Sequence, residues 1–178
     1  VHRQCGAVSP FVAASRDKAV IEAAITAERP DFKLPDGVTG ITVPHHLLAA
    51  DLVARGFWAA SANRYDRILL IAPDHFRKVK RPFSVARDEL DTVFGTVRAD
   101  TAAVATLLAQ TDLFEAAVDV AGEHGIMSIA PFIRRFFPDT PVVAILASAN
   151  SSPQAWEGAA ATLTSVVTVP DGYAVVVG

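Results

Sequence analysis

Two histidines occupy equivalent places in the sequence, because each closely follows an apolar run rich in β-branched residues. His45 comes after Gly40–Val43 and His75 comes after Arg67–Ala72, so that the two histidines are 30 positions apart. That spacing is about the length of one strand–helix–strand unit, which places both histidines just past the carboxyl ends of two successive strands. Open α/β sheets bind ligands at this edge, and imidazole nitrogens are common ligands of iron, zinc and copper. The sequence therefore predicts a metal site with His45 and His75 as ligands.

A third feature is the pair Glu123-His124, which opens a predicted helix. The partial positive charge at a helix N-terminus lowers the pKa of a nearby histidine and keeps it neutral. His124 is therefore predicted to act as a general base. For Glu123 the sequence leaves two roles open: it orients His124, or it supplies a carboxylate to a metal that two histidines also hold. Both residues are candidate catalytic residues.

Two further residues flank the candidate ligands. His46 either caps the helix that follows it or lines the mouth of the site. Asp74 either is a ligand or hydrogen-bond acceptor beside His75, or only forms the turn after the strand. We treat both as candidate pocket residues. A group of cations after His75 either attracts an anionic substrate or belongs to a solvated loop; it consists of Arg77, Lys78, Lys80 and Arg81.

The helices and strands that must position these residues alternate along the chain. Apolar residues at helical spacing predict helices over Arg16–Glu28, His46–Asn63, Thr101–Gln110, Ile126–Phe137 and Pro153–Val166. Continuous apolar runs predict strands, each covered on both faces, over Gly40–Val43, Arg67–Ala72, Pro141–Ala147 and Tyr173–Val177. The expected fold class is α/β, a three-layer α/β/α sandwich with a largely parallel (mixed) central sheet.

Three details of these elements are also predicted. Asp100 is expected to cap the helix that begins at Thr101. Pro131 either bends its helix or marks the true first turn. The polar stretch Arg77–Arg98, which contains Phe83–Val85 and Thr92–Val97, interrupts the alternation of strands and helices. We expect it to be an excursion that forms a hairpin rather than a linker.

Composition limits the class of protein. The 178 residues are 51% hydrophobic and 20% charged, which excludes a disordered chain and indicates a single domain over residues 1–178. The net charge of −3 argues against a nucleic-acid partner, and no apolar run is long enough to span a membrane. The single cysteine, Cys5, excludes a disulfide scaffold and favours a reducing, cytoplasmic compartment. Because the chain closes on an apolar, strand-like run, we expect the native protein to continue beyond Gly178.

The motifs around these residues resemble those of the Memo-like proteins, which in bacteria and archaea are called AmmeMemoRadiSam system protein B. Three motifs stand in the order and spacing of that family: Val43-Pro-His45, Ile71-Ala-Pro-Asp-His75 and Glu123-His-Gly-Ile-Met-Ser-Ile-Ala-Pro-Phe132. The similarity runs from about Gly40 to the last residue. One departure is that the family pattern Pro-His-Ala-Gly-Tyr is replaced here by Pro44-His45-His46-Leu47-Leu48, so that His46 brings a ligand or donor that the relatives lack.

The resemblance carries expectations about fold and site. It implies the α/β fold that the family shares with class III extradiol ring-cleavage dioxygenases, which use non-haem Fe(II). It implies that His45 and His75 are metal ligands and that His124 matches the acid/base histidine beside the bound substrate. The third ligand of the family follows the strand that here ends at Gly178, so the resemblance implies a domain without its C-terminal part.

Three functions remain open for these residues. The first is a redox or dioxygenase-like protein that holds Fe(II), or copper, between His45 and His75 and binds a small aromatic ligand. The second is a metal-independent binding or scaffold module that uses the pocket to dock a peptide or protein partner. The third is a zinc hydrolase in which Glu123 activates a metal-bound water. The sequence leaves open whether the chain is an enzyme.

Overall fold

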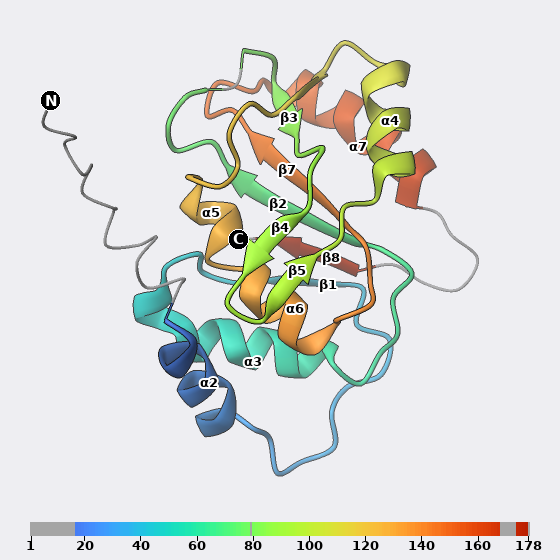
Figure 1. The fold of residues 1–178 in the computed structure, drawn as a ribbon. Helices are drawn as coiled ribbons and strands as arrows, with labels where there is room; N and C mark the ends of the chain where they lie inside the picture. Colours follow the sequence, from blue (N-terminus) through green and yellow to red (C-terminus); the bar gives the residue numbers. More distant parts are fainter. Residues whose placement is uncertain (1–16, 79, 168–173, 178) are drawn as a thin grey trace, which may run out of the picture.

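Six strands form the central sheet of the computed structural model, which describes residues 17–78, 80–167 and 174–177 (Figure 1). In spatial order they are β1 (Gly40–Thr42), β8 (Ala174–Val177), β2 (Ile68–Pro73), β7 (Val142–Ala147), β3 (Phe83–Val85) and β6 (Phe114–Ala116). Neighbouring strands are parallel except for β3, which runs antiparallel to β7. The sheet is therefore mixed and largely parallel, which confirms the predicted fold class. Two predicted elements begin outside the described residues, at Arg16 and Tyr173. Cys5 and Gly178 also lie outside them.

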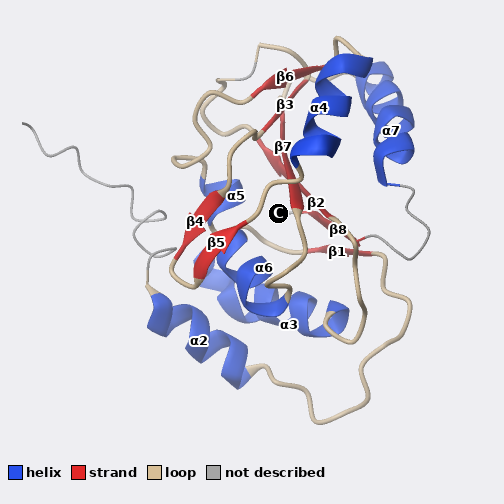
Figure 2. Cartoon of the chain, turned by 45° about the vertical axis from the view of Figure 1, so that its right-hand side comes forward, coloured by secondary structure: helices blue, strands red, loops and turns tan. Residues whose placement is uncertain are grey.

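Helices cover both faces of this sheet (Figure 2). They are α2 (Lys18–Ala27), the 3₁₀ helix η1 (Leu47–Ala49), α3 (Ala50–Ala60), α4 (Thr101–Gln110), α5 (His124–Met127), α6 (Ala130–Phe136) and α7 (Pro153–Val167). Side chains along β2 alternate between two hydrophobic cores, Ile68 and Leu70 in one and Leu69 in the other. The first core includes buried residues of α2, α3 and α6, and the second includes buried residues of α4 and α7. Among the residues described, no helix has both the length and the apolar character needed to cross a membrane.

The predicted helix over Ile126–Phe137 is two short helices. α5 ends at Met127, and α6 begins at Ala130 with Pro131 in its first turn. Backbone N–H groups in the first turn of a helix make no hydrogen bond within the helix. A proline, which has no backbone N–H, therefore costs no hydrogen bond there. Of the two roles predicted for Pro131, the structure shows the first-turn role.

Two other helix predictions differ in accuracy. α4 spans the predicted Thr101–Gln110, and the carboxylate of Asp100 caps it by accepting a hydrogen bond from the N–H of Ala103 at 2.9 Å. The helix predicted over His46–Asn63 begins later, at Ala50, because η1 occupies the first turn.

The stretch Arg77–Arg98 forms a hairpin only in its second half. There β4 (Leu90–Thr92) pairs antiparallel with β5 (Gly95–Val97). The prediction of an excursion was wrong for Phe83–Val85, because these residues form β3, a buried strand of the central sheet. β3 pairs with β6, a strand that the sequence did not predict. All three residues of β3 are buried, and the free energy of burying them favours a place in the sheet despite the polar sequence on either side.

β1, β8 and β2 run parallel, so their carboxyl ends lie at one edge of the sheet, where β2 continues two residues beyond its last pair with β8. Thr42 of β1 and Ile71 of β2 both pair with Val177 of β8. His45 follows three residues after the end of β1, and His75 follows two residues after the end of β2. Both histidines therefore leave the sheet at the same edge, as predicted, although β8 separates their strands.

Candidate metal centre

His45 and His75 face each other across this edge. Their Nε2 atoms are 3.0 Å apart, and their ring centroids are 4.7 Å apart. Two nitrogens bound at about 2.0–2.1 Å from one ion lie about 3 Å apart when the angle at the ion is near 90°. The observed separation fits two ligands of a single ion, and it equally fits a hydrogen bond between the two ring nitrogens.

The carboxylate of Glu123 holds His75 from the side opposite His45. Its Oε1 lies 2.7 Å from Nδ1 of His75 and accepts the N–H of Gly125 at 3.1 Å. Its Oε2 accepts the backbone N–H of His75 at 3.2 Å, and the residue is only 2% exposed. Because a buried carboxylate accepts a proton at Nδ1, Nε2 of His75 is left with its electron pair directed toward His45. Carboxylates orient the histidine ligands of many metal sites in this way.

Glu123 is engaged with His75 more closely than with His124, the residue that the sequence had paired with it. Nδ1 of His124 lies 3.6 Å from Oε1 of Glu123, which is beyond a good hydrogen bond. His75, Glu123 and His124 nevertheless form a group whose donor atoms lie within 4.8 Å of one another, so they could also hold an ion. The hydrogen bonds described above give Glu123 the geometry of a positioning residue for His75.

His124 lies over His75 and beside His45, with ring centroids 3.9 Å and 5.6 Å away. The pKa of His124 is lowered, chiefly because burial disfavours the charged imidazolium and further because His75 and His46 are close; Glu123 opposes this shift. The direction is the one expected from the sequence. The causes identified are burial and the neighbouring imidazoles. The effect of the helix N-terminus stays a prediction. A neutral imidazole at this place can accept a proton from a molecule bound near His75.

His46 and Asp74, the candidate pocket residues, are placed differently. His46 is exposed, and its ring lies 4.8 Å from that of His45 and 5.7 Å from that of His124. It stands at the N-cap position of η1, but its side chain makes no capping hydrogen bond, so the capping alternative does not hold. Asp74 is 5% exposed, and its backbone N–H donates to the carbonyl of Ala147 at 2.9 Å, which continues the pairing of β2 with β7.

The cations that follow His75 are partly neutralised by neighbours. Lys78 Nζ lies 2.7 Å from Asp119, and a guanidinium nitrogen of Arg81 lies 3.1 Å from Asp112. The hydrogen bond from Lys78 is the main cause that lowers the pKa of Asp119. These ion pairs favour the solvated-loop interpretation of the cluster.

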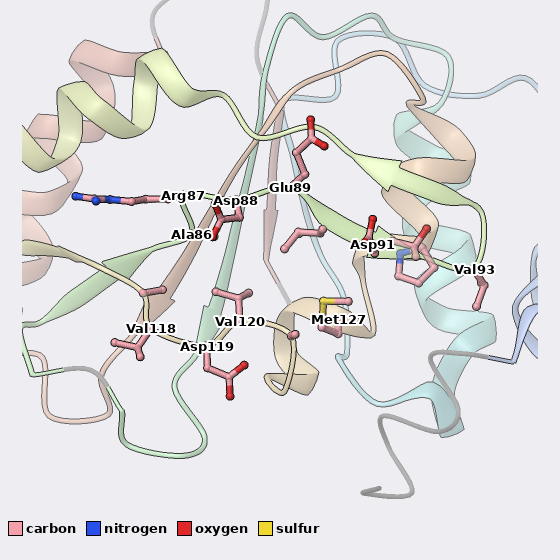
Figure 3. A pocket seen from close by; sticks show the side chains of 15 residues that line it. Ala86, Arg87, Asp88, Glu89, Asp91, Val93, Val118, Asp119, Val120 and Met127 are labelled. Atoms are coloured by element: carbon pink, nitrogen blue, oxygen red, sulfur yellow. The ribbon is translucent and has the colours of Figure 1, made fainter.

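A cavity of about 760 Å³ lies between the β4–β5 hairpin and the segment 117–121 that leads to Glu123 (Figure 3). Met127 of α5 lines it, but His45, His46 and Asp74 do not. The cavity is therefore separate from the histidine cluster. Its charged lining residues are Arg87, Asp88, Glu89, Asp91 and Asp119.

Gly125 belongs to the site, although the sequence had not singled it out as a functional residue. A Cβ at this position would lie 3.0 Å from Cβ of Ala72 and 3.2 Å from Cε1 of His75. A glycine therefore lets α5 approach β2 and the ring of His75. The available signal was its place directly after Glu123-His124 in the motif.

Replacing Gly125 with alanine is expected to weaken metal binding by about 10- to 100-fold, because the added methyl group displaces the ring of His75 from its carboxylate. Zn²⁺ titration in competition with a chelating dye measures the change in Kd. Gly122→Ala is a matched control, because a Cβ there meets Asp119 at 3.4 Å, an ordinary contact. An unchanged Kd in Gly125→Ala would show that this close approach does not position His75.

Comparison with known protein families agrees with the motifs. The family model described as Memo-like protein matches residues 14–177, a span that includes the four clustered histidines and Glu123. A search of curated proteins gives no match. Since the matched span is most of the sequence, the chain belongs to the Memo-like protein family.

Proposed function

We propose that this Memo-like protein is a metal-dependent oxidoreductase whose ion is held by His45 and His75. Fe(II) is the ion we expect first, with copper or zinc as the other candidates. The observation that carries the proposal is the 3.0 Å separation of the two Nε2 atoms, combined with the contact of His75 Nδ1 to Glu123. The donor chemistry fits, since imidazole nitrogens bind iron, copper and zinc.

Fe(II) at this place would supply a Lewis acid and a redox partner for O₂. Glu123 keeps the ring of His75 in position for this ion. His124, whose ring lies 3.9 Å from that of His75, is placed to accept the hydroxyl proton of a molecule bound beside His75. A small aromatic diol of the catechol type has such a proton, and we propose this class as the substrate.

The hydrolase alternative gives Glu123 another task, the activation of a water on zinc. Both of its carboxylate oxygens accept hydrogen bonds from His75 or Gly125, and the residue is 2% exposed. Because both oxygens are engaged in these hydrogen bonds, Glu123 is better suited to orient His75 than to take a proton from a water. This favours the oxidoreductase over the hydrolase.

Anaerobic titration with Fe(II), followed by O₂-uptake measurements with a panel of catechols, tests the proposal. We expect one Fe(II) per chain and O₂ uptake that requires both the iron and the diol. Protein treated with a chelator is the control. Failure to bind iron, or bound iron without diol-dependent uptake, would contradict the proposal, and peptide binding unaffected by the chelator would support the scaffold alternative instead.

A further inference from the structure

The cavity between the β4–β5 hairpin and the segment 117–121 has no part in the function proposed above. Its volume of about 760 Å³ lies in the range of ligand-binding sites in proteins. Every residue from Ala86 to Val93 lines it, whereas no residue of β5 does (Figure 3). The cavity therefore runs along β4 on the side away from β5, and we call it the β4 groove.

β4 has a free edge at this groove. Among the described residues it pairs with β5 alone, in a two-stranded sheet. Alternate residues of an antiparallel strand direct their N–H and C=O groups away from the partner strand. No backbone hydrogen bond joins residues 87–93 to the segment 117–121 within the part of the chain that the structure describes. A strand edge of this kind can accept an extended peptide as an additional strand.

Apolar side chains line the groove opposite β4. Val118 and Val120 belong to the segment 117–121, and Met127 belongs to α5. Val118 is 90% exposed, so most of its apolar surface is open to a ligand. Because alternate side chains of a strand lie on the same face, an added strand can pack a row of apolar side chains against this wall.

The β4 wall of the groove is acidic. Asp88, Glu89 and Asp91 are exposed and follow one another closely along it. Asp91 accepts a hydrogen bond from the hydroxyl of Thr96 at 3.1 Å. The side chains of Asp88 and Glu89 form no hydrogen bond or ion pair with another described residue. These two carboxylates are therefore available to cationic side chains of a ligand.

The other charged residues of the lining do not offset these carboxylates. Arg87 also lines a second cavity, along α4, and Figure 3 shows its guanidinium directed away from Val120 and Met127. Asp119, on the opposite wall, forms an ion pair with Lys78. The groove therefore carries a net negative charge.

This charge disfavours one occupant and favours another. A second copy of the chain would bring the same acidic edge against this one, and like charges along edge strands oppose such pairing. A segment with basic side chains would instead form ion pairs in the same position.

We propose that the β4 groove binds an extended, basic segment of a partner protein, which adds to β4 as a third strand of the hairpin sheet. Its cationic side chains pair with Asp88 and Glu89, and its apolar side chains pack against Val118. Because β4 has only three residues, the main chain contributes few hydrogen bonds, and we expect a Kd of about 10–100 μM. None of the clustered histidines lines the groove, so this binding requires no metal.

A blocked peptide of alternating lysine and valine is the probe, and a glutamate–valine peptide is its control. Fluorescence anisotropy at low ionic strength should show binding of the lysine–valine peptide alone, and added salt should weaken it. Amide chemical-shift changes should map to residues 88–93 and 117–121. Binding should persist in His75→Ala and in the presence of a chelator.

Substitution of the two available carboxylates tests the charge. Asp88→Asn/Glu89→Gln should raise the Kd about 5-fold or more, because two ion pairs are lost. Asp66→Asn/Glu157→Gln removes the same charge from exposed positions outside the groove and should leave the Kd unchanged.

N-methylated peptides test the addition of a strand. One peptide carries N-methyl groups on its valines and the other carries them on its lysines. An added strand uses only alternate N–H groups for the edge that it joins, so one of the two peptides should lose binding and the other should keep it. Equal binding of both would show that the ligand does not pair with β4.

Several outcomes would overturn the inference. A lysine–valine peptide that does not bind, or that binds equally well to Asp88→Asn/Glu89→Gln, contradicts it. Shift changes confined to the histidine cluster, or loss of binding in His75→Ala, would place the peptide at the metal centre instead. A dimer in sedimentation velocity whose dissociation on dilution shifts the amides of β4 would assign the groove to a second copy. The result of the iron titration affects none of these outcomes, so the inference and the proposed function fail independently.

Discussion

Alanine in place of His75 is expected to abolish stoichiometric metal binding. His75 supplies one of the two nitrogens that lie 3.0 Å apart, and Glu123 holds its ring in place. Without His75 the site loses the ligand whose orientation is fixed before the ion binds. Such preorganisation contributes much of the free energy of metal binding. Metal analysis after gel filtration should find about one ion per chain in the wild type and almost none in His75→Ala.

The fold of this variant should persist, because His75 lies in the turn after β2 and its side chain is 25% exposed. Thermal unfolding monitored by circular dichroism tests this directly. Lys80→Ala is a suitable control, as it removes an exposed side chain from the same loop. A folded His75→Ala protein that still carries one ion per chain would remove His75 from the ligand set.

The second large effect is expected for Glu123→Gln. A carboxamide has one acceptor oxygen and an NH₂ group that only donates, so it cannot accept hydrogen bonds from both sides as Glu123 does. We expect the Kd for Zn²⁺ to rise about 10- to 100-fold, because the ring of His75 loses its orientation. We also expect the free energy of unfolding to fall by about 1–3 kcal/mol, because a buried N–H donor loses its acceptor. Competition titration and urea denaturation measure the two effects separately.

Glu115→Gln is the matched control for this substitution. Glu115 also accepts backbone N–H groups, those of Lys80 and Arg81, but it is not part of the histidine cluster. Both N–H groups reach its Oε1, and a carboxamide keeps one acceptor oxygen, so Glu115→Gln should change neither the free energy of unfolding nor the metal affinity. If the Kd of Glu123→Gln were as little changed as that of Glu115→Gln, the carboxylate of Glu123 would not position His75.

The sequence predicted His45 and His75 together because parallel strands with crossover helices bring their carboxyl ends to one edge. That argument depends on strand direction and requires no knowledge of strand order, so it held even though β8 lies between β1 and β2. The contact of Glu123 with His75 was not predictable in the same way. It joins residues 48 positions apart through a turn whose geometry depends on the packing of α5 against β2.

The errors in the fold have a similar origin. Phe83–Val85 and Phe114–Ala116 have a polar, unbranched residue at their centre, Ser84 and Glu115, so neither forms an apolar run rich in β-branched residues. Their pairing with each other and with β7 determines their structure. By contrast, α4 carries both an N-cap and a helical apolar pattern, and its predicted bounds agree with the structure.

The position of β8 in the sheet has a consequence for how the protein folds. β1 has β8 as its neighbour in the sheet, so the first strand gains its hydrogen-bonded partner only when the last described strand enters between β1 and β2. Such a pairing closes a very long loop and is expected late in folding, only after β8 has been synthesised. The loop that carries His45 is therefore anchored to the sheet late in folding. Acquisition of metal would then follow completion of the native topology rather than guide it.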